Sequence, residues 1–189
     1  MEELRQVMRF GGILAESQID QVLSHYQEQW LDAMEHNLQI GKICNRISFI
    51  SHGIIRSYAI DNNGDEVTKY FSRKQQFLVD LESFYEQKPA ETACQAVVPS
   101  KIYYIGRSSW FQLMEEIPKF FILSKSLAEA ALLNKIKDND FLNFGTATDK
   151  YQEFLWRYPD LAQQVPQGMI ASYLKITPQS LSRIRRRKL

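Results

Sequence analysis

Cysteine, histidine and glycine are all scarce in this 189-residue chain. The two cysteines, Cys44 and Cys94, are too few to hold an iron–sulfur cluster by themselves, and we expect both to be reduced core residues. The three histidines, His25, His36 and His52, lack the spacing of metal ligands. The eight glycines are scattered, so the sequence has no glycine-rich phosphate loop. We therefore expect no metal, no cofactor and no enzymatic activity.

Long apolar runs are also missing. No segment approaches the roughly 20 consecutive apolar residues that a membrane-spanning helix needs. The N-terminal sequence, MEELRQVMRF, lacks the apolar core of a signal peptide. Because 44% of the residues are hydrophobic and 24% are charged, the composition is typical of a globular protein and not of a disordered one. We expect a cytoplasmic protein without a membrane partner.

Acidic residues are missing from position 161 onward, where six cations occur. The whole chain carries a formal charge of +1, so residues 1–160 carry −5. A basic patch confined to one end of a chain is typical of nucleic-acid binding. It favours DNA binding over the alternative, an ordinary helical hairpin with a solvated basic end. The six cations are Lys175, Arg183, Arg185, Arg186, Arg187 and Lys188.

The C-terminal segment has the pattern of two short helices joined by a tight turn. Ile170 and Leu174 recur at helical spacing, and a second helix is expected to begin at Thr177, a hydroxyl N-cap followed by proline. Leu181 and Ile184 give this second helix one apolar edge, and its opposite edge is polar. The pattern predicts a helix-turn-helix that binds double-stranded DNA. Expected contacts to base edges are Gln179, Ser180, Ser182 and Arg183, and expected contacts to phosphates are Arg185, Arg186, Arg187 and Lys188.

The hydrophobic period along the rest of the chain predicts an α+β fold. Residues 1–30 follow a helical period, and from His36 the period changes to two. Residues 61–65, DNNGD, are a strong hairpin signal because Asn and Gly tolerate the positive φ of tight turns. Short strand-like segments continue as far as Ile105, with turn residues between them. We expect a small antiparallel barrel or roll.

A long helix is expected between residues 119 and 142. Its apolar residues follow a three-four spacing, which favours a seam between two copies of the chain. The alternative is a helix that packs only against its own barrel. We divide the chain into residues 1–117, 118–145 and 146–189, and we expect Trp156 to pack beneath the helix-turn-helix. The predicted seam residues are Phe120, Leu123, Leu127 and Ala130.

Three segments, taken in order, resemble the Crp/Fnr family of bacterial transcription regulators. The strongest is residues 167–187, where IASYL-x-ITPQSLSRIRR is similar to the helix-turn-helix of one large branch of that family. Residues 47–58, ISFISHGIIRSY, resemble its barrel hairpin with the turn glycine, here Gly53. Residues 77–84, FLVDLESF, resemble the start of its phosphate-binding cassette. The resemblance implies a cyclic-nucleotide-binding-type β-roll with flanking helices, a long dimerisation helix and a C-terminal DNA-binding domain.

The cassette departs from the family pattern where cyclic nucleotide would bind. Family members that bind it have a Gly-Glu pair at the start of the cassette and an Arg-Ser or Arg-Thr pair after it. Here Val79-Asp80 and Ala90-Glu91 align with these pairs. A carboxylate repels phosphate where arginine would bind it, so we expect no cyclic nucleotide in the family's usual mode. The degenerate effector pocket comprises Val79, Asp80, Leu81, Glu82, Ala90 and Glu91.

Two further departures concern the helix-turn-helix. Lys175 stands at the turn position where the family usually has glycine, and a positive φ there would cost about 1 kcal/mol. The sequence stops at Leu189, so we expect a helix-turn-helix without the complete β-hairpin wing of the better-known members. The leading interpretation is a homodimeric DNA-binding transcription regulator, with an unidentified small-molecule effector left open. The alternative is a ligand-sensing or protein-interaction module that no longer binds DNA.

Overall fold

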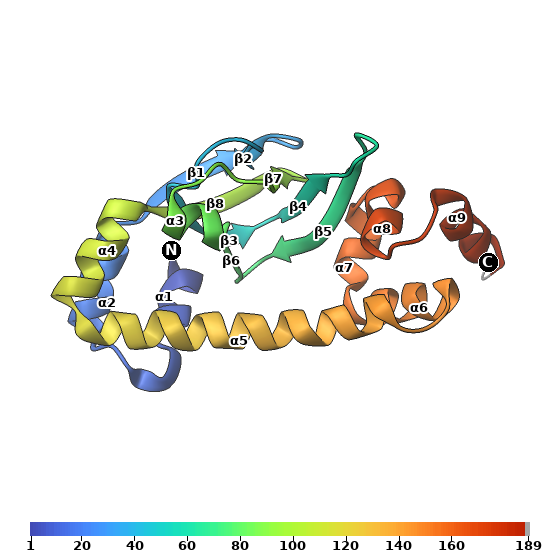
Figure 1. Cartoon of the computed structure of the whole chain (residues 1–189). Helices are drawn as coiled ribbons and strands as arrows, with labels where there is room; N and C mark the ends of the chain where they lie inside the picture. Colours follow the sequence, from blue (N-terminus) through green and yellow to red (C-terminus); the bar gives the residue numbers. More distant parts are fainter. Residues whose placement is uncertain (188–189) are drawn as a thin grey trace. The chain divides into compact units, whose positions relative to one another are not determined.

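The structure is a computed structural model that describes residues 1–187 (Figure 1). Its internal contacts divide the chain into two units. Unit 1 comprises Met1–Ser57 and Phe71–Glu129, and unit 2 comprises Tyr58–Tyr70 and Ala130–Leu189. Unit 2 therefore combines the C-terminal helices with a segment from the middle of the chain.

The strands within the described residues form two four-stranded sheets. The first sheet has the order β1-β8-β3-β6, and the second has the order β2-β7-β4-β5. Strands β3 and β8 pair antiparallel, so that Ile47 lies opposite Ile105 and Phe49 lies opposite Tyr103. These sheets confirm the antiparallel roll that the sequence predicts. The strand bounds are β1 Gln27–Leu31, β2 His36–Leu38, β3 Arg46–His52, β4 Ile54–Ile60, β5 Glu66–Arg73, β6 Phe77–Leu78, β7 Ala93–Ala96 and β8 Ser100–Gly106.

Gly53 makes the turn between β3 and β4. Its φ is +99°, in the region that favours glycine. A Cβ atom at this position would lie 2.7 Å from the Cα of Ser100, closer than side chains approach backbone. Ser100 is buried, and its Oγ accepts from the N–H of Ile54 (3.2 Å) and donates to the carbonyl of Val98 (2.7 Å). The start of β8 therefore lies too close to the turn for any residue but glycine.

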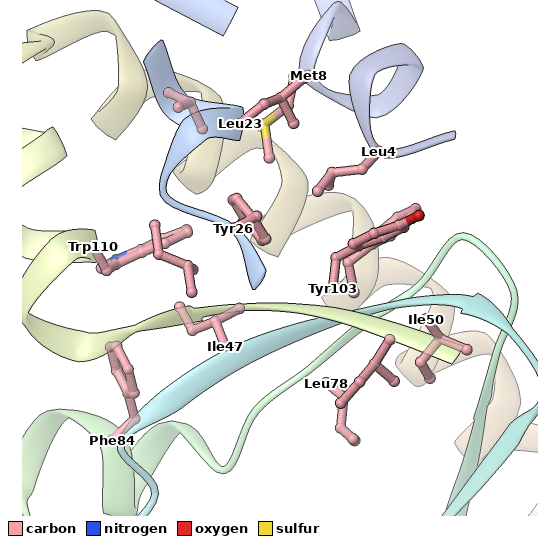
Figure 2. Packing of buried hydrophobic residues seen from close by; sticks show 14 of the residues in the cluster. Leu4, Met8, Leu23, Tyr26, Ile47, Ile50, Leu78, Phe84, Tyr103 and Trp110 are labelled. Carbon is pink, nitrogen blue, oxygen red and sulfur yellow. The ribbon is translucent and has the colours of Figure 1, made fainter. Parts of the chain in front are cut away.

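Helices cover one side of the first sheet and enclose the main core (Figure 2). Three side chains point toward Ile47 and Tyr103 on the sheet: Leu4 from α1, Tyr26 from the residue before β1, and Trp110 from α4. All five side chains are at most 7% exposed. Burying each large apolar side chain stabilises the fold by about 1.5–3 kcal/mol. The helices before residue 144 are α1 Glu2–Met8, the 3₁₀ helix Phe10–Gly12, α2 Glu16–Ser24, α3 Leu81–Glu86, α4 Arg107–Glu116 and α5 Pro118–Asn143.

The helical prediction for residues 1–30 is wrong in two places. Gly11 and Gly12 have φ values of +64° and +62°, which no α-helix accommodates, so the segment is divided into α1 and α2. After α2 the chain changes to strand β1 at Gln27. The helical spacing of apolar residues in this segment therefore holds within α1 and within α2, but not across the glycines or into β1.

The C-terminal helices of unit 2 pack around Phe154, which is fully buried. The ring of Phe154 lies 5.9 Å from that of Tyr173, between ring centroids. Trp156 is 77% exposed, so the expectation that it packs beneath the helix-turn-helix is wrong. Trp156 lies two positions after Phe154, a spacing of about 200° that places the two side chains on different sides of one helix. The helices are α6 Ala147–Arg157, α7 Pro159–Gln164, α8 Gln167–Tyr173 and α9 Pro178–Arg187.

None of the helices in residues 1–187 combines the length and apolar character needed to cross a membrane. The two cysteines lie in the core, where Cys44 is 5% exposed and Cys94 is 2% exposed. Burial raises the pKa of the Cys44 thiol, so this side chain stays protonated and acts as a small apolar group.

Candidate functional site

Lys175 makes the turn of the helix-turn-helix with a φ of +57°. Its N–H donates to the carbonyl of Ser172 (3.1 Å), and the N–H of Ile176 donates to the carbonyl of Ala171 (3.0 Å). These two bonds satisfy the last carbonyls of α8, as in other helices that end in a left-handed residue. Lys175 thus adopts the left-handed conformation that glycine adopts most readily.

Helix α9 begins with a side-chain cap at Thr177. Its Oγ1 accepts a hydrogen bond from the N–H of Ser180 (3.1 Å), and its hydroxyl donates to the Oγ of Ser180 (2.9 Å). Pro178 follows as the first residue of the helix, where its missing N–H costs nothing. The predicted cap is confirmed, and the hydroxyl of Ser180 is part of it.

The exposed face of α9 carries Gln179, Arg183 and Arg186. Their spacing places them on one side of the helix, whereas Leu181 is 1% exposed on the other. Within residues 1–187, neither Arg183 nor Arg186 forms an ion pair with an acidic side chain. Both guanidinium groups are therefore open to an anionic partner.

The other predicted DNA contacts lie beside or beyond this face. Ser182 and Arg185 are partly buried on the flanks of α9. Arg187 is the last residue of the helix, and Lys188 lies outside the described residues. Helix α9 contains no acidic residue, so its charge is entirely positive. This charge suits the phosphates on either side of a DNA groove.

Two carboxylates occupy the start of α3, in the segment that aligns with the phosphate-binding cassette. Asp80 is the N-cap of α3, and its Oδ1 accepts a hydrogen bond from the N–H of Ser83 (3.1 Å). Glu82 adds a second carboxylate in the first turn. The positive end of the helix dipole is therefore matched by the chain's own acidic groups.

The end of the cassette also lacks a phosphate ligand. Ala90 is 3% exposed, its N–H donates to the carbonyl of Lys42 (2.9 Å), and its methyl group offers no donor. The next residue, Glu91, is an exposed carboxylate. Val79 packs against the core, and Leu81 is 55% exposed. Neither Ala90 nor Glu91 therefore places a cationic side chain at the end of the cassette.

Arg46 is a half-buried cation of the roll that sequence analysis missed. Its Nη1 donates to the Oε1 of Gln29 (2.8 Å), and its Nη2 donates to the carbonyl of Asn37 (3.1 Å). Its guanidinium carbon also lies 4.7 Å from the ring centroid of Tyr104. Burial lowers the pKa of Arg46. An arginine at the start of a strand gives no sequence signal that it will point among polar groups of neighbouring strands.

The predicted seam on α5 is wrong at its first two residues. Phe120 and Leu123 are 1% and 0% exposed, and they pack in the core of their own chain. The ring of Phe120 lies 4.9 Å from that of Trp110, between centroids. Leu127 is partly buried against the same core, and Ala130 is exposed. A fully buried side chain has no surface left for a second copy, so this face packs on its own barrel.

The opposite face of α5 carries an apolar stripe of large side chains, each more than half exposed. At about 100° per residue, the stripe covers about 120° of the helix surface, on the side away from Phe120 and Leu123. The exposed ion pair of Lys125 and Glu129 (3.9 Å) lies on the same side of α5, between Ile122 and Leu132, so the stripe consists of two apolar groups. Exposed apolar groups of this size are typical of binding surfaces. The exposed fractions are Phe121 56%, Ile122 53%, Leu132 58%, Leu133 59% and Ile136 51%.

The sequence of the roll matches a known domain family. Residues 28–117 match the sequence model of the cyclic nucleotide-binding domain. The matched segment runs from β1 to the residue before α5. The roll is therefore similar in sequence to the cyclic nucleotide-binding domain. Among curated protein sequences, none matches the chain.

Solved structures of bacterial regulators have the fold of this chain. A transcriptional regulator of the Crp/Fnr family from Eubacterium rectale superposes with a TM-score of 0.75 at 12% identity, over 96% of this chain and 87% of that one. The c-di-GMP-responsive regulator CLP from Xanthomonas campestris gives 0.74 at 13%, over 92% and 91%. FixK2 from Bradyrhizobium japonicum gives 0.72 at 15%, over 86% and 83%. The chain therefore has the Crp/Fnr regulator fold.

Proposed function

We propose that this protein is a cytoplasmic DNA-binding transcription regulator of the Crp/Fnr type that acts as a homodimer. The observation that carries the proposal is the exposed face of α9, where Gln179, Arg183 and Arg186 follow a capped helix start. In this proposal residues 1–117 form the roll, residues 118–145 form the dimerisation helix and residues 146–189 form the DNA-binding domain.

Helix α9 enters the major groove, which is wide enough to admit an α-helix. Arg183 is the candidate for a bidentate contact to O6 and N7 of guanine, because its guanidinium is exposed and forms no ion pair within the described chain. Gln179, one turn earlier, reaches a neighbouring base edge, and Arg186 reaches a phosphate. Arg185, Arg187 and Lys188 add positive charge to the same end.

Dimerisation places two such helices about one DNA turn apart on a two-fold symmetric site. The apolar stripe of α5 supplies the surface for a second copy of the chain, since the opposite face of the helix is already buried. Ile122, Leu133 and Ile136 are separated by 11 and 3 residues, a spacing that keeps them in line along one helix. The seam thus differs from the one that the sequence predicts.

The roll of this regulator does not bind cyclic AMP or cyclic GMP in the family's usual mode. Asp80 already caps α3, and Ala90 and Glu91 stand where a cation and a hydroxyl are needed.

A salt titration of binding to genomic DNA fragments tests the proposal. The logarithm of the association constant falls with the logarithm of salt concentration by about 0.9 for each phosphate that the protein neutralises. We expect binding at low salt and a steep loss of affinity as salt rises. Absence of binding even at low salt would reject a DNA-binding function and support the alternative, a ligand-sensing or protein-interaction module.

A further inference from the structure

Helix α8 binds the open edge of strand β5, the outer strand of the second sheet. The N–H of Thr68 donates to the Oγ of Ser172 over 2.9 Å. The Ser172 hydroxyl in turn donates to the carbonyl of Glu66 over 3.4 Å. Glu66 and Thr68 are two residues apart, so their backbone groups point to the same side of the strand. One serine side chain therefore binds both a donor and an acceptor of the strand edge.

Contacts with α5 hold α8 from a second direction. Tyr70, the next residue on the same side of β5, lies beneath the Nζ of Lys135 on α5, 4.1 Å from the ring centroid. The rings of Phe141 on α5 and Tyr173 on α8 are 6.3 Å apart, between centroids. All of these residues belong to unit 2, which groups residues 58–70 with the C-terminal helices. The hairpin between β4 and β5 is therefore part of the same body as the helix-turn-helix.

We propose that Ser172 is a positioning residue that fixes the helix-turn-helix on the β4–β5 hairpin. The proposal rests on the DNA-binding function proposed above. The Ser172 side chain binds the hairpin at Thr68, and its carbonyl accepts the N–H of Lys175 in the turn. The same residue thus joins the hairpin to the turn from which α9 starts. Fixing the turn limits the orientations of α9, which lowers the entropy lost when α9 binds DNA.

The hairpin also gives the roll a covalent route to the recognition helix. Strand β4 passes from unit 1 into unit 2 after Ser57, and β5 returns to unit 1 after Tyr70. A displacement of either strand within the roll moves Glu66 and Thr68, and these residues are hydrogen-bonded to Ser172.

Hydrogen exchange at the Thr68 amide tests the contact without DNA. Ser172→Ala removes the acceptor, so the Thr68 amide is expected to exchange about fivefold faster, the ratio for a hydrogen bond of about 1 kcal/mol. Ser172→Thr keeps the hydroxyl and is expected to retain the wild-type rate. Ser24→Ala is the control, because the Ser24 Oγ donates only to the Gln21 carbonyl of its own helix (2.7 Å). An unchanged Thr68 rate in Ser172→Ala would overturn the proposal.

DNA affinity tests the positioning role. Ser172→Ala is expected to bind a genomic fragment about fivefold more weakly than wild type, with the same salt slope because no phosphate contact is removed. Ser172→Thr is expected to restore the affinity, and Ser24→Ala is expected to leave it unchanged. Faster exchange at Thr68 with unaltered DNA affinity would show that Ser172 holds the hairpin without positioning α9, and the proposal would be wrong. If the wild-type protein binds no DNA at low salt, the DNA-binding function itself fails, while the exchange measurement still decides the hairpin contact.

Discussion

The ammonium of Lys175 donates a hydrogen bond to the Oδ1 of Asn143 over 2.8 Å and so joins the turn of the helix-turn-helix to the last residue of α5. Lys175 has a φ of +57°, which costs a residue with a Cβ atom about 1 kcal/mol. A glycine would avoid this cost but could not make the bond. The strain of the Lys175 backbone is therefore offset by the hydrogen bond that its side chain makes to α5.

Substitutions at Lys175 separate the two effects. Lys175→Gly relieves the strain and loses the bond, so its free energy of unfolding is expected to stay within about 0.5 kcal/mol of wild type. Lys175→Ala keeps the strain and loses the bond, so a destabilisation of about 0.5–1 kcal/mol is expected. Urea denaturation followed by circular dichroism measures both. Asn143→Ala removes the same bond at unchanged φ and is the control. A Lys175→Ala protein more stable than Lys175→Gly would contradict this account of the turn.

Substitutions on α9 distinguish base contacts from phosphate contacts. Arg183→Ala is expected to cost about 1–3 kcal/mol of binding free energy and to relax the preference at one base pair. Arg186→Ala is expected to weaken all sequences by a similar factor and to reduce the salt slope by about one. Fluorescence anisotropy on a set of single-base operator variants, at several salt concentrations, measures both effects. An Arg183→Ala protein with unchanged affinity and unchanged preference would show that the face is wrongly assigned.

The helix-turn-helix is predictable from sequence because its signals are local. Thr177 and Pro178 define the start of α9, and Lys175 occupies the turn, all within a few residues of one another. The roll is predictable for a related reason, since period-two hydrophobicity and turn residues such as Gly53 act on their own neighbours. The prediction of a helix through residues 1–30 fails at Gly11 for the same reason. The apolar residues on both sides have helical spacing, and that spacing does not reveal the positive φ of the glycine between them.

Contacts between distant segments could not be predicted in the same way. Both faces of α5 carry apolar residues at helical spacing, and tertiary packing, for example of Phe120 against Trp110, decides which face is buried. The hydrogen bond between Thr68 and Ser172 joins residues 104 positions apart. A serine in a short helix gives no sequence signal of such a partner. The same limit applies to Arg46, whose partners lie on other strands.

The apolar stripe of α5 predicts which substitution separates a dimer. Ile136→Asp places a charge in the stripe, where burial against a second copy would leave it without a partner, so we expect monomers. Ala130→Asp introduces the same carboxylate at an exposed position on the other side of α5 and is expected to leave the dimer intact. Sedimentation velocity at micromolar concentration measures the oligomeric state of each protein. If Ala130→Asp is monomeric while Ile136→Asp stays dimeric, the dimer uses the seam that the sequence predicts. A monomeric wild-type protein would exclude both the predicted seam and the apolar stripe as dimer interfaces.

The cassette residues predict the outcome of calorimetry with cyclic nucleotides. Titration with millimolar cyclic AMP or cyclic GMP is expected to give no saturable heat, because Ala90 and Glu91 stand where the cassette needs a cation and a hydroxyl. Loss of a buried, charge-assisted contact costs several kcal/mol, and each 1.4 kcal/mol is about tenfold in affinity. A weak interaction at millimolar concentration is therefore the most that the cassette supports.

A dissociation constant in the low micromolar range would contradict this prediction, because the phosphate would then need a cation from another part of the roll. Arg46 and Arg56 are the residues to substitute in that case, since both guanidinium groups are at least half-buried among strands of the roll. Loss of the heat in Arg46→Gln but not in Arg73→Gln, a substitution at the end of β5, would place the phosphate beside Arg46. Equal loss in both would instead indicate a non-specific effect of positive charge, because the two variants remove the same charge at different sites.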